Sequence, residues 1–434
     1  MSPFFEIAYA AVSNSLCLFT GTGFSKAISE NEAPSWKGLL ESMCDLTDKP
    51  EELKAGLFPN GEVNSLSLEE AAQVISIELE KNGKSIHEEI AALIKTIKLK
   101  GDNSSIAKFL TAWPFTVIST NYDKLIETLS GEGDCYSLSP GLPIPRSEAR
   151  VKVYHVHGSV DSPVNMVVTS NDYFQFINSE SYFSKKLSTI LHENCVVILG
   201  YSLGDNNLKS ILSNYKGFSK NHVISSNIIF ISRTAINKHV KDYYSHCYGI
   251  RVMDEISVHQ FFEKLEATLD SARSKVEPSI SNIKKVIIEN KIYSESYVRN
   301  ENSFYEIILS IAAIGKSIDD KSIVAALGKV IEMKIKLTCE NHAWDQYTHL
   351  AEWLIYLANI LELKGTTIES IYLNATLKSM NSMSQETYVG YSWQAYKSWS
   401  EKWLGIIASN RILIRNYVEK NSTSPDALLL VKRN

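Results

Sequence analysis

Through about residue 275, short apolar or β-branched runs alternate with longer segments whose apolar residues recur every three or four positions. This alternation is typical of a parallel sheet covered by helices, because strands buried on both faces are apolar throughout. We expect strands over residues 16–20, 115–119, 151–156, 195–200, 228–232 and 249–253. Between the first two, the helical periodicity over about residues 35–112 is too long for a simple crossover. The pattern therefore predicts an α/β fold, a Rossmann-like parallel sheet with a helical insertion.

The pattern changes beyond residues 271–285, a polar segment with one proline and no strong period that we interpret as a linker. The stretches that follow are long, amphipathic and almost free of proline. They predict an all-α C-terminal domain over residues 286–434, after a first domain over residues 1–275. The C-terminal region holds five of the seven tryptophans, Trp344, Trp353, Trp393, Trp399 and Trp403. An aromatic stripe at helical spacing most often forms core, and the other interpretation is a surface for self-association or for a partner protein.

The composition is that of an ordinary globular protein, with 434 residues of which 44% are hydrophobic and 21% are charged. The 44 basic and 49 acidic side chains give a net charge of −5, which argues against binding of nucleic acid through bulk electrostatics. We therefore expect no direct nucleic-acid partner. No basic stretch precedes the apolar N-terminal residues, and no run approaches the ~18–20 apolar residues that a membrane span needs. The sequence predicts a cytoplasmic protein without a membrane segment.

The six cysteines are widely spaced. They include no CxxC pair and lack the dense spacing of a disulfide-stapled secreted domain. We interpret them as reduced thiols, which fits a cytoplasmic location.

The first candidate motif follows the first predicted strand, in the sequence LCLFTGTGFSKAI over residues 16–28. Gly21 and Gly23 allow a tight turn and a close approach to a pyrophosphate, whose charge the unpaired amides of the next helix would meet. The motif departs from the dinucleotide fingerprint, because Lys26 stands where a third glycine is usual. A glycine-rich turn without any ligand is the alternative interpretation.

The second candidate motif, VISTNYDKLIE over residues 117–127, ends a predicted strand with clustered polar residues. Open α/β sheets place ligand groups at the carboxyl ends of their strands. Asn121 offers both a donor and an acceptor, and Asp123 can accept from an amide or a hydroxyl. Capping of the following helix by Asn121 or Asp123 is the alternative interpretation.

The third candidate motif, VYHVHGSV over residues 153–160, places His155 and His157 on alternate positions at a strand end. A histidine in a mainly apolar strand is more often a buried structural residue than a catalyst. The order of the three motifs on successive predicted strands changes this balance in favour of a common site.

Together, GTGFS, STNYD and HVHGS, followed by VVILGYSLGD, resemble the motifs of the sirtuin-like (SIR2) superfamily, in particular its bacterial antiphage-defence-associated NADase branch. Sirtuins show Gly-Ala-Gly-x-Ser, Thr-Gln-Asn-x-Asp and His-Gly at the corresponding places. The resemblance covers roughly residues 10–255 and implies a site for NAD as substrate. The catalytic residues that it implies are His157, Asn121 and Asp123. The NAD-binding residues that it implies are Gly21, Thr22, Gly23, Ser25, Thr120, Gly200, Ser202 and Asp205.

Protein-deacylating sirtuins carry a four-cysteine zinc module with paired CxxC spacing, which this sequence lacks, and we expect no metal. The resemblance therefore implies an NAD+ hydrolase that releases nicotinamide and ADP-ribose. It also implies a toxic effector of an antiphage abortive-infection system, held inactive until a trigger arrives. Two alternatives stay open, NAD-dependent protein deacylation and a nucleotide-sensing module that binds NAD or ADP-ribose without cleaving it. We expect the C-terminal helical region to mediate homo-oligomerisation or to bind a companion regulatory protein.

Overall fold

The computed structural model describes residues 3–433 apart from 60–65, 132–133, 144–148, 179–181, 203–227, 290, 315, 317 and 319. Seven parallel strands form one sheet in the order β3-β4-β2-β1-β5-β6-β7. Their bounds are β1 Leu16–Thr20, β2 Phe115–Ser119, β3 Cys135–Leu138, β4 Val151–His155, β5 Cys195–Leu199, β6 Ile228–Ile231 and β7 Ile250–Met253. The six predicted strands are confirmed, and β3 is an addition at the sheet edge. Its residues are mostly half-buried, so they do not form the apolar run by which buried strands are recognised.

The strand order reverses at β1. The chain passes from β1 to β2 on one side of it and returns to β5 on the other side. Thr20 is paired with Ser119 of β2 and with Leu199 of β5, so the three strands end at the same level. In open parallel sheets, the crevice beyond such a reversal is where ligands bind.

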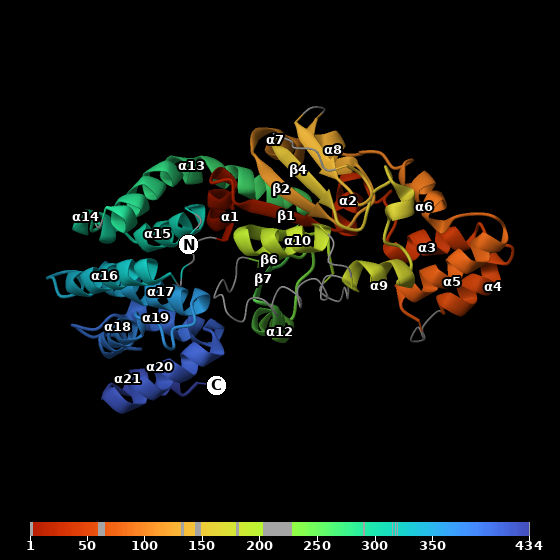
Figure 1. Cartoon of the computed structure of the whole chain (residues 1–434). Coiled ribbons are helices and arrows are strands. Elements are labelled where there is room, and N and C mark those ends of the chain that lie inside the picture. The colour runs from red at the N-terminus through yellow and green to blue at the C-terminus, as the bar shows by residue number, and fades with distance from the viewer. Residues whose placement is uncertain are drawn as a thin grey trace.

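Helices cover both faces of this sheet (Figure 1). One face packs against α1 (Pro3–Val12), α2 (Thr22–Ile28), α7 (Ser104–Ala112), α8 (Leu125–Ser130) and the first part of α13 (Val258–Ile288). The other face packs against α10 (Tyr182–Glu193) and α12 (Lys238–Tyr248). Along β1, Leu16 and Leu18 belong to the first core, whereas Cys17 and Phe19 belong to the second. Burial of both faces explains why this strand is apolar over successive residues.

The predicted helical insertion consists of five helices, α3 (Trp36–Cys44), α4 (Pro50–Leu57), α5 (Leu68–Lys81), α6 (Ile86–Ile94) and α7. Buried residues such as Leu40, Ile75 and Ile90 join the insertion to the core on one face of the sheet. After β4 and the short 3₁₀ turn η1 (Pro163–Asn165), α9 (Ser170–Asn178) packs on α5. Helices α3 to α6 and α9 lie together beyond the sheet, away from the C-terminal helices (Figure 1).

The prediction of a linker over residues 271–285 is wrong, because these residues lie inside the 31-residue helix α13. Ser257 caps the start of this helix and accepts a hydrogen bond from a first-turn amide. Pro278 lies on the exposed side of the helix, where its missing amide removes one hydrogen bond without interrupting the buried stripe. Within the predicted linker, the buried positions are Ala272, Val276, Ser279 and Ile283. The polar composition therefore reflects a helix that buries one narrow stripe.

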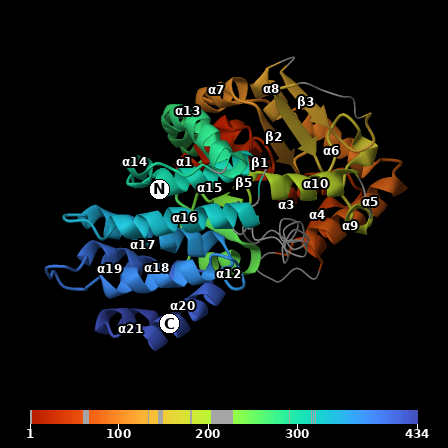
Figure 2. The same cartoon turned by 60° about the vertical axis from the view of Figure 1, so that its left-hand side comes forward.

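Beyond α13 the regular elements of the described chain are helical (Figure 2). They are α14 Glu295–Val298, α15 Ser303–Ala313, α16 Lys321–Leu337, α17 Trp344–Ile360, α18 Glu369–Asn381, α19 Trp393–Lys402, η2 Trp403–Gly405, α20 Ala408–Asn421 and α21 Pro425–Val431. Their core is separate and begins at Ile283, whereas the core that includes α1 and the sheet ends at Ala272. The predicted fold class, a Rossmann-like sheet followed by an all-α region, is confirmed. None of the helices described here combines the length and hydrophobicity that crossing a membrane requires.

The aromatic stripe of the C-terminal region divides between core and surface. Trp353, Trp399 and Trp403 are fully buried, whereas Trp344 is 52% exposed and Trp393 is 46% exposed. The core interpretation therefore holds for these three tryptophans, and the interaction surface stays a prediction.

Helix α1 connects the sheet to the C-terminal helices. It packs along α13 and also contacts α15. The Tyr9 hydroxyl lies 2.9 Å from Ser310 Oγ of α15, and Glu6 pairs with Arg251 of β7 at 2.7 Å. The two parts of the chain are therefore joined by the packing and hydrogen bonding of α1 as well as by the continuous helix α13.

Candidate active site

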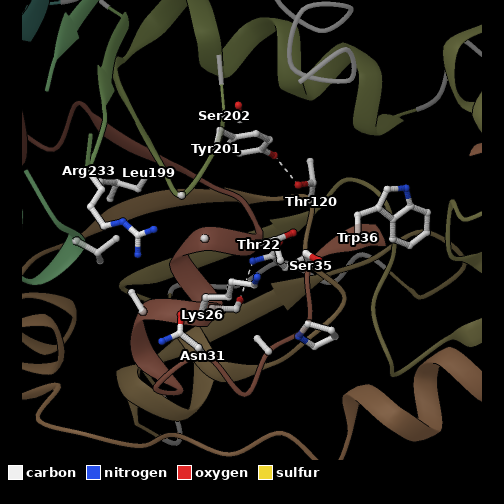
Figure 3. A pocket seen from close by; sticks show the side chains of 18 of the residues that line it. Thr22, Lys26, Asn31, Ser35, Trp36, Thr120, Leu199, Tyr201, Ser202 and Arg233 are labelled. Carbon is white, nitrogen blue, oxygen red and sulfur yellow. Dashed lines mark hydrogen bonds between the residues drawn. The ribbon is translucent and has the colours of Figure 1, made fainter. Parts of the chain in front are cut away.

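A cavity of about 750 Å³ opens at the carboxyl ends of β1, β2, β5 and β6, where the strand order reverses (Figure 3). Its volume lies in the usual range of small-molecule and cofactor sites. The predicted site residues that line it are Thr22, Gly23, Ser25, Thr120, Asn121, Asp123, His157, Gly200 and Ser202. Gly21 adjoins this lining without belonging to it, and Asp205 lies outside the described residues. The fold therefore brings residues of all three motifs to one cavity.

The glycine turn between β1 and α2 is held against the end of β5. The amide of Gly21 donates to the carbonyl of the last β5 residue at 3.0 Å, and the amide of Gly23 donates to Gly200 O at 2.8 Å. A Cβ at Gly23 would lie 2.8 Å from Gly200 O, and a Cβ at Gly21 would lie 2.6 Å from the Tyr201 ring. These glycines therefore permit close packing, and their amides are occupied. Among the described residues, Thr22 has no partner at its amide or hydroxyl, so it is a donor that this turn presents to the cavity.

The side chain of Asn121 ties the turn after β2 to the start of α2. Asn121 is buried, and its Nδ2 donates to Gly21 O at 2.9 Å and to Ser25 Oγ at 2.7 Å. The Ser25 hydroxyl donates in turn to Asp123 Oδ2 at 2.7 Å. No described residue donates to Asn121 Oδ1, which therefore remains an acceptor at the cavity.

The carboxylate of Asp123 accepts two hydrogen bonds within the chain. Ser25 donates to Oδ2, and the amide of Leu125 donates to Oδ1 at 3.1 Å. Leu125 is the first residue of α8, but the N-cap position is Lys124, so Asp123 accepts from the first helical amide without being the N-cap residue. Burial raises the pKa of Asp123, against the opposing effect of these hydrogen bonds and of the charge on His155. A desolvated carboxylate at the cavity is well suited to stabilise a positive charge that develops there.

His157 follows β4, and its buried side chain lines the cavity. The rings of Tyr173 and Phe176 on α9 pack edge-on against the imidazole, with centroid separations of 5.4 and 5.2 Å. In the described part of the chain, no hydrogen bond reaches the ring nitrogens. Burial lowers the pKa of His157 to about 4. The imidazole is therefore neutral at pH 7 and can accept a proton there.

His155 occupies a different environment, two residues earlier on β4. Its Nδ1 lies 2.9 Å from Asn121 O, and its Nε2 lies 2.7 Å from Glu127 Oε1. Burial opposes a charge on the ring, but Glu127 and the Asn121 carbonyl outweigh it and raise the pKa of His155. Although burial also opposes the charged form of Glu127, the interaction with His155 lowers the pKa of Glu127 to about 2. His155 does not line the cavity. It fixes the main chain of Asn121 through the contact with the Asn121 carbonyl.

Several residues of the cavity were missed at the sequence level. Trp36 begins α3 and packs edge-on against Tyr122, with ring centroids 6.2 Å apart. The Tyr201 hydroxyl bonds to the Thr120 hydroxyl, and Arg233 brings a positive charge from the turn after β6 (Figure 3). Trp36 and Arg233 lie outside the quoted motifs, whereas Tyr201 lies within VVILGYSLGD but was given no role. A large aromatic residue inside the polar sequence EAPSWKG is the signal that could have indicated Trp36.

The sequence model of the SIR2-like domain family matches residues 116–253. The chain carries a SIR2-like domain. The matched segment runs from β2 to β7 and includes Asn121, Asp123 and His157. The glycine turn after β1 lies outside the matched residues. The resemblance inferred from the three motifs is therefore confirmed at the level of the superfamily.

Curated relatives of the chain bear names that refer to defence or to NAD+ hydrolysis. The chain is 24% identical over 275 residues to Defense-associated sirtuin 2 of Bacillus subtilis, covering 61% of this chain and 26% of that protein. It is 28% identical over 201 residues to NAD(+) hydrolase ThsA of Bacillus cereus (strain MSX-D12), covering 45% of this chain and 39% of that protein. It is 27% identical over 220 residues to NAD(+) hydrolase ThsA of Cytobacillus dafuensis, covering 48% and 39%. The matches thus span only 26% to 39% of the length of these relatives.

Proposed function

We propose that the chain is an NAD+ hydrolase that cleaves the nicotinamide–ribose bond and releases nicotinamide and ADP-ribose. The observation that carries this proposal is the convergence of the Asn121–Ser25–Asp123 hydrogen bonds and His157 in one cavity at the strand reversal. The similarity to proteins named NAD(+) hydrolase supports the same reaction.

The chemistry of the bond determines what such a site must supply. The bond joins a cationic nicotinamide ring to the anomeric carbon of the ribose. On cleavage the nicotinamide leaves as a neutral molecule, while positive charge develops on the ribose. An enzyme accelerates this step by holding the carboxamide, twisting it from its relaxed geometry and placing negative or dipolar groups near the sugar.

We assign Asn121 and Asp123 to these two tasks. The Nδ2 of Asn121 is already occupied, so its free Oδ1 is the atom that would accept a hydrogen bond from the nicotinamide carboxamide. The carboxylate of Asp123 would stabilise the positive charge on the ribose. Because Ser25 already orients both side chains, little reorganisation is needed during the reaction.

We assign proton transfer to His157. Its neutral imidazole can accept a proton from a ribose hydroxyl or from the attacking water, whose oxygen forms the new bond to the anomeric carbon. The adjacent positive charge acidifies that hydroxyl or water, so a base with a lowered pKa suffices. Tyr173 and Phe176 would exclude other water molecules from the imidazole.

The remaining predicted residues are assigned to the rest of the NAD molecule. Thr22 would donate its free amide and hydroxyl to the phosphates, while Gly21 and Gly23 act by allowing the close turn. Thr120, Gly200 and Ser202 would line the ribose and adenosine side. The role of Asp205 stays a prediction from the resemblance.

We further propose that the activity serves antiphage defence. Destruction of NAD is toxic to the cell that carries the enzyme, so the chain would act as an abortive-infection effector that is held inactive until phage infection. The name of the Bacillus subtilis relative, Defense-associated sirtuin 2, supports this role.

The C-terminal helical region, over residues 286–434, is the part that we assign to control. It would mediate homo-oligomerisation or bind a companion regulatory protein. The exposed side chains of Tyr388, Val389, Tyr391 and Trp393 support an interaction surface there, since large apolar groups gathered on a surface often mark contact sites. Measuring the mass of the full chain with Val389→Asp and Trp393→Asp tests this assignment, and an unchanged oligomer together with unchanged regulation would contradict it.

Two alternatives predict different observations. A nucleotide-sensing module would bind NAD+ saturably without releasing nicotinamide under any condition. A protein deacylase would consume NAD+ only with an acyl-lysine peptide. The sequence has no CxxC pair for the zinc module of deacylating sirtuins, and His, Cys, Asp and Glu form no metal-binding group of three within the described ranges. Chromatographic detection of nicotinamide from NAD+, with and without an acyl-lysine peptide, separates the three functions.

A further inference from the structure

Helix α9 links the helical insertion to the side chain of His157. Its residues Tyr173 and Phe176 enclose the imidazole, with ring centroids at 5.4 and 5.2 Å. The segment before α9 also contacts the histidine, because the amide of Val167 donates to His157 O at 2.8 Å. The position of α9 therefore determines how the imidazole is oriented and how well it is shielded from water.

The start of α9 is held by the carboxylate of Asp172. Its Oδ2 accepts hydrogen bonds from the amide of Val168 at 3.1 Å, from the amide of Thr169 at 2.8 Å and from the Thr169 hydroxyl at 2.9 Å. Burial opposes the charged form, but hydrogen bonds from His87, Thr169 and Val168 lower the pKa of Asp172 to about 2. Asp172 is therefore ionised at neutral pH and accepts hydrogen bonds only.

His87 donates to this carboxylate from outside the α9 segment. Its Nε2 lies 2.9 Å from Asp172 Oδ2, and because the carboxylate can only accept, the proton resides on Nε2. The side chains of His87 and Asp172 are only 20% and 25% exposed, so water competes weakly for the contact. His87 belongs to α6, whose Ile90 is fully buried in the core. This packing holds the backbone of His87 in place.

A second contact joins the insertion to the same helix end. Gln73 of α5 accepts a hydrogen bond from the amide of Asn171 at 3.3 Å. Both contacts come from the insertion, and both reach the first turn of α9. The insertion is thus coupled to the cavity through α9, in addition to the residues that it contributes to the cavity wall.

We propose that His87 is a positioning residue of the site: through Asp172 it fixes α9, and α9 holds Tyr173 and Phe176 around the imidazole of His157. Only the effect on catalysis rests on the proposed NAD+ hydrolase function. The effect on the environment of His157 is measurable in the absence of any activity.

Histidine titration by NMR tests this proposal on the full chain. Wild type, His87→Phe and His87→Gln are labelled with ¹³C-histidine, and the His157 signal is assigned by its loss in His157→Gln. His87→Phe fills the space without a donor, whereas His87→Gln retains an N–H that can reach the carboxylate. His239→Ala, which removes an exposed histidine, is the control.

The wild type, His87→Gln and the control are expected to titrate His157 near pH 4. In His87→Phe the looser α9 admits water to the imidazole, and the titration is expected to rise by about one pH unit or more. The other charged or titratable acid and base groups that line the cavity with His157 are unchanged in all of these variants, namely Lys26, Asp123, Arg233 and His259. An unchanged titration in His87→Phe overturns the proposal, and so does an equal shift in His87→Gln.

The catalytic effect is measured separately as nicotinamide release. In His87→Phe the kcat is expected to fall about 10-fold with little change in KM, because a misplaced base affects the reaction more than binding, and His87→Gln is expected to restore it. A shifted His157 titration in His87→Phe, together with a wild-type chain that never cleaves NAD+, would support the positioning role and overturn the proposed function. Normal cleavage by His87→Phe together with an unchanged His157 titration would overturn the positioning role and support the proposed function.

Discussion

Asn121 Nδ2 donates to Ser25 Oγ at 2.7 Å, across the gap between the residues that follow β2 and those that follow β1. Ser25 in turn donates to Asp123, so a single hydroxyl orients both polar side chains that we assign to the nicotinamide and the ribose. The two motifs are far apart in sequence, and they meet because β1 and β2 are adjacent parallel strands that end at the same level.

Loss of the Ser25 hydroxyl should therefore weaken catalysis without changing the assigned reacting groups. We expect Ser25→Ala to lower kcat for NAD+ cleavage about 10- to 100-fold, since Asn121 and Asp123 lose their shared partner. Ser139→Ala is the matched control, because Ser139 is buried and bonded to Ser159 at 2.8 Å but does not line the cavity. Equal kcat values for the two variants would contradict this role of Ser25.

The contact between Gly200 and α2 predicts a large cost for an added methyl group. Gly200 has φ of +76°, and a Cβ there would lie 2.1 Å from the Phe24 amide nitrogen. Gly83 has φ of +68° with open space around its Cβ position, so it isolates the cost of the backbone conformation. We expect Gly200→Ala to lower the free energy of unfolding by at least about 2 kcal/mol more than Gly83→Ala. Similar denaturant midpoints for the two variants would show that the turn can relax.

The environment of His157 predicts a pH dependence of stability. Its pKa is lowered from 6.5 in the unfolded chain to about 4 in the folded chain, so between these values the unfolded state binds a proton that the native state does not. Stability from this group is therefore complete above pH 6.5 and is lost as the pH falls toward 4. We expect the wild type to lose about 3 kcal/mol more than His157→Gln between pH 7 and pH 4. Parallel stability curves would indicate a hydrated imidazole.

His155, which is paired with Glu127, is expected to show the opposite pH dependence of stability from that of His157. The raised pKa of His155 contributes stability that is fully present below the ordinary histidine pKa and is lost as the pH rises through the pKa of the folded state. The lowered pKa of Glu127 contributes stability that is lost as the pH falls toward 2. We expect Glu127→Ala to cost about 3–5 kcal/mol at pH 7, because it leaves a buried histidine without its counter-charge.

The control for Glu127→Ala is an exposed ion pair. Glu78→Ala removes the partner of Lys81 on α5 and should cost less than about 1 kcal/mol. Urea unfolding of both variants gives the comparison. A cost for Glu127→Ala as small as that for Glu78→Ala would mean that His155 simply loses its proton without penalty.

The parts of the fold that the sequence predicted are those that depend on local pattern. Apolar runs identified six strands because a parallel sheet covered on both faces demands them, and β3 escaped because it lies half-buried at the edge. The predicted linker around Pro278 was wrong because a narrow buried stripe and an outward-facing proline are compatible with a long helix. Composition alone does not distinguish these two arrangements.

The site shows the same division. Asn121, Asp123 and His157 were predicted from motifs that follow strands and from the resemblance of these motifs to those of sirtuins, and the fold places all three at one cavity. The occupied amides of Gly21 and Gly23, the burial of His157 and the contribution of α9 depend on which segments pack together, so the sequence did not indicate them. The link from His87 to Asp172 spans two helices far apart in the chain, and it became visible only in the folded structure.

The most direct test of the account is nicotinamide release from NAD+ by the full chain. Purified wild type, His157→Ala, Asn121→Ala and the control His239→Ala are compared, and cellular NAD+ is measured in phage-challenged cells that express each of them. Wild type and control are expected to release equimolar nicotinamide and ADP-ribose, with rates lower by about 100-fold or more in the two site variants. Undiminished release by His157→Ala or Asn121→Ala, or binding of NAD+ without any release by the wild type in both settings, would contradict it.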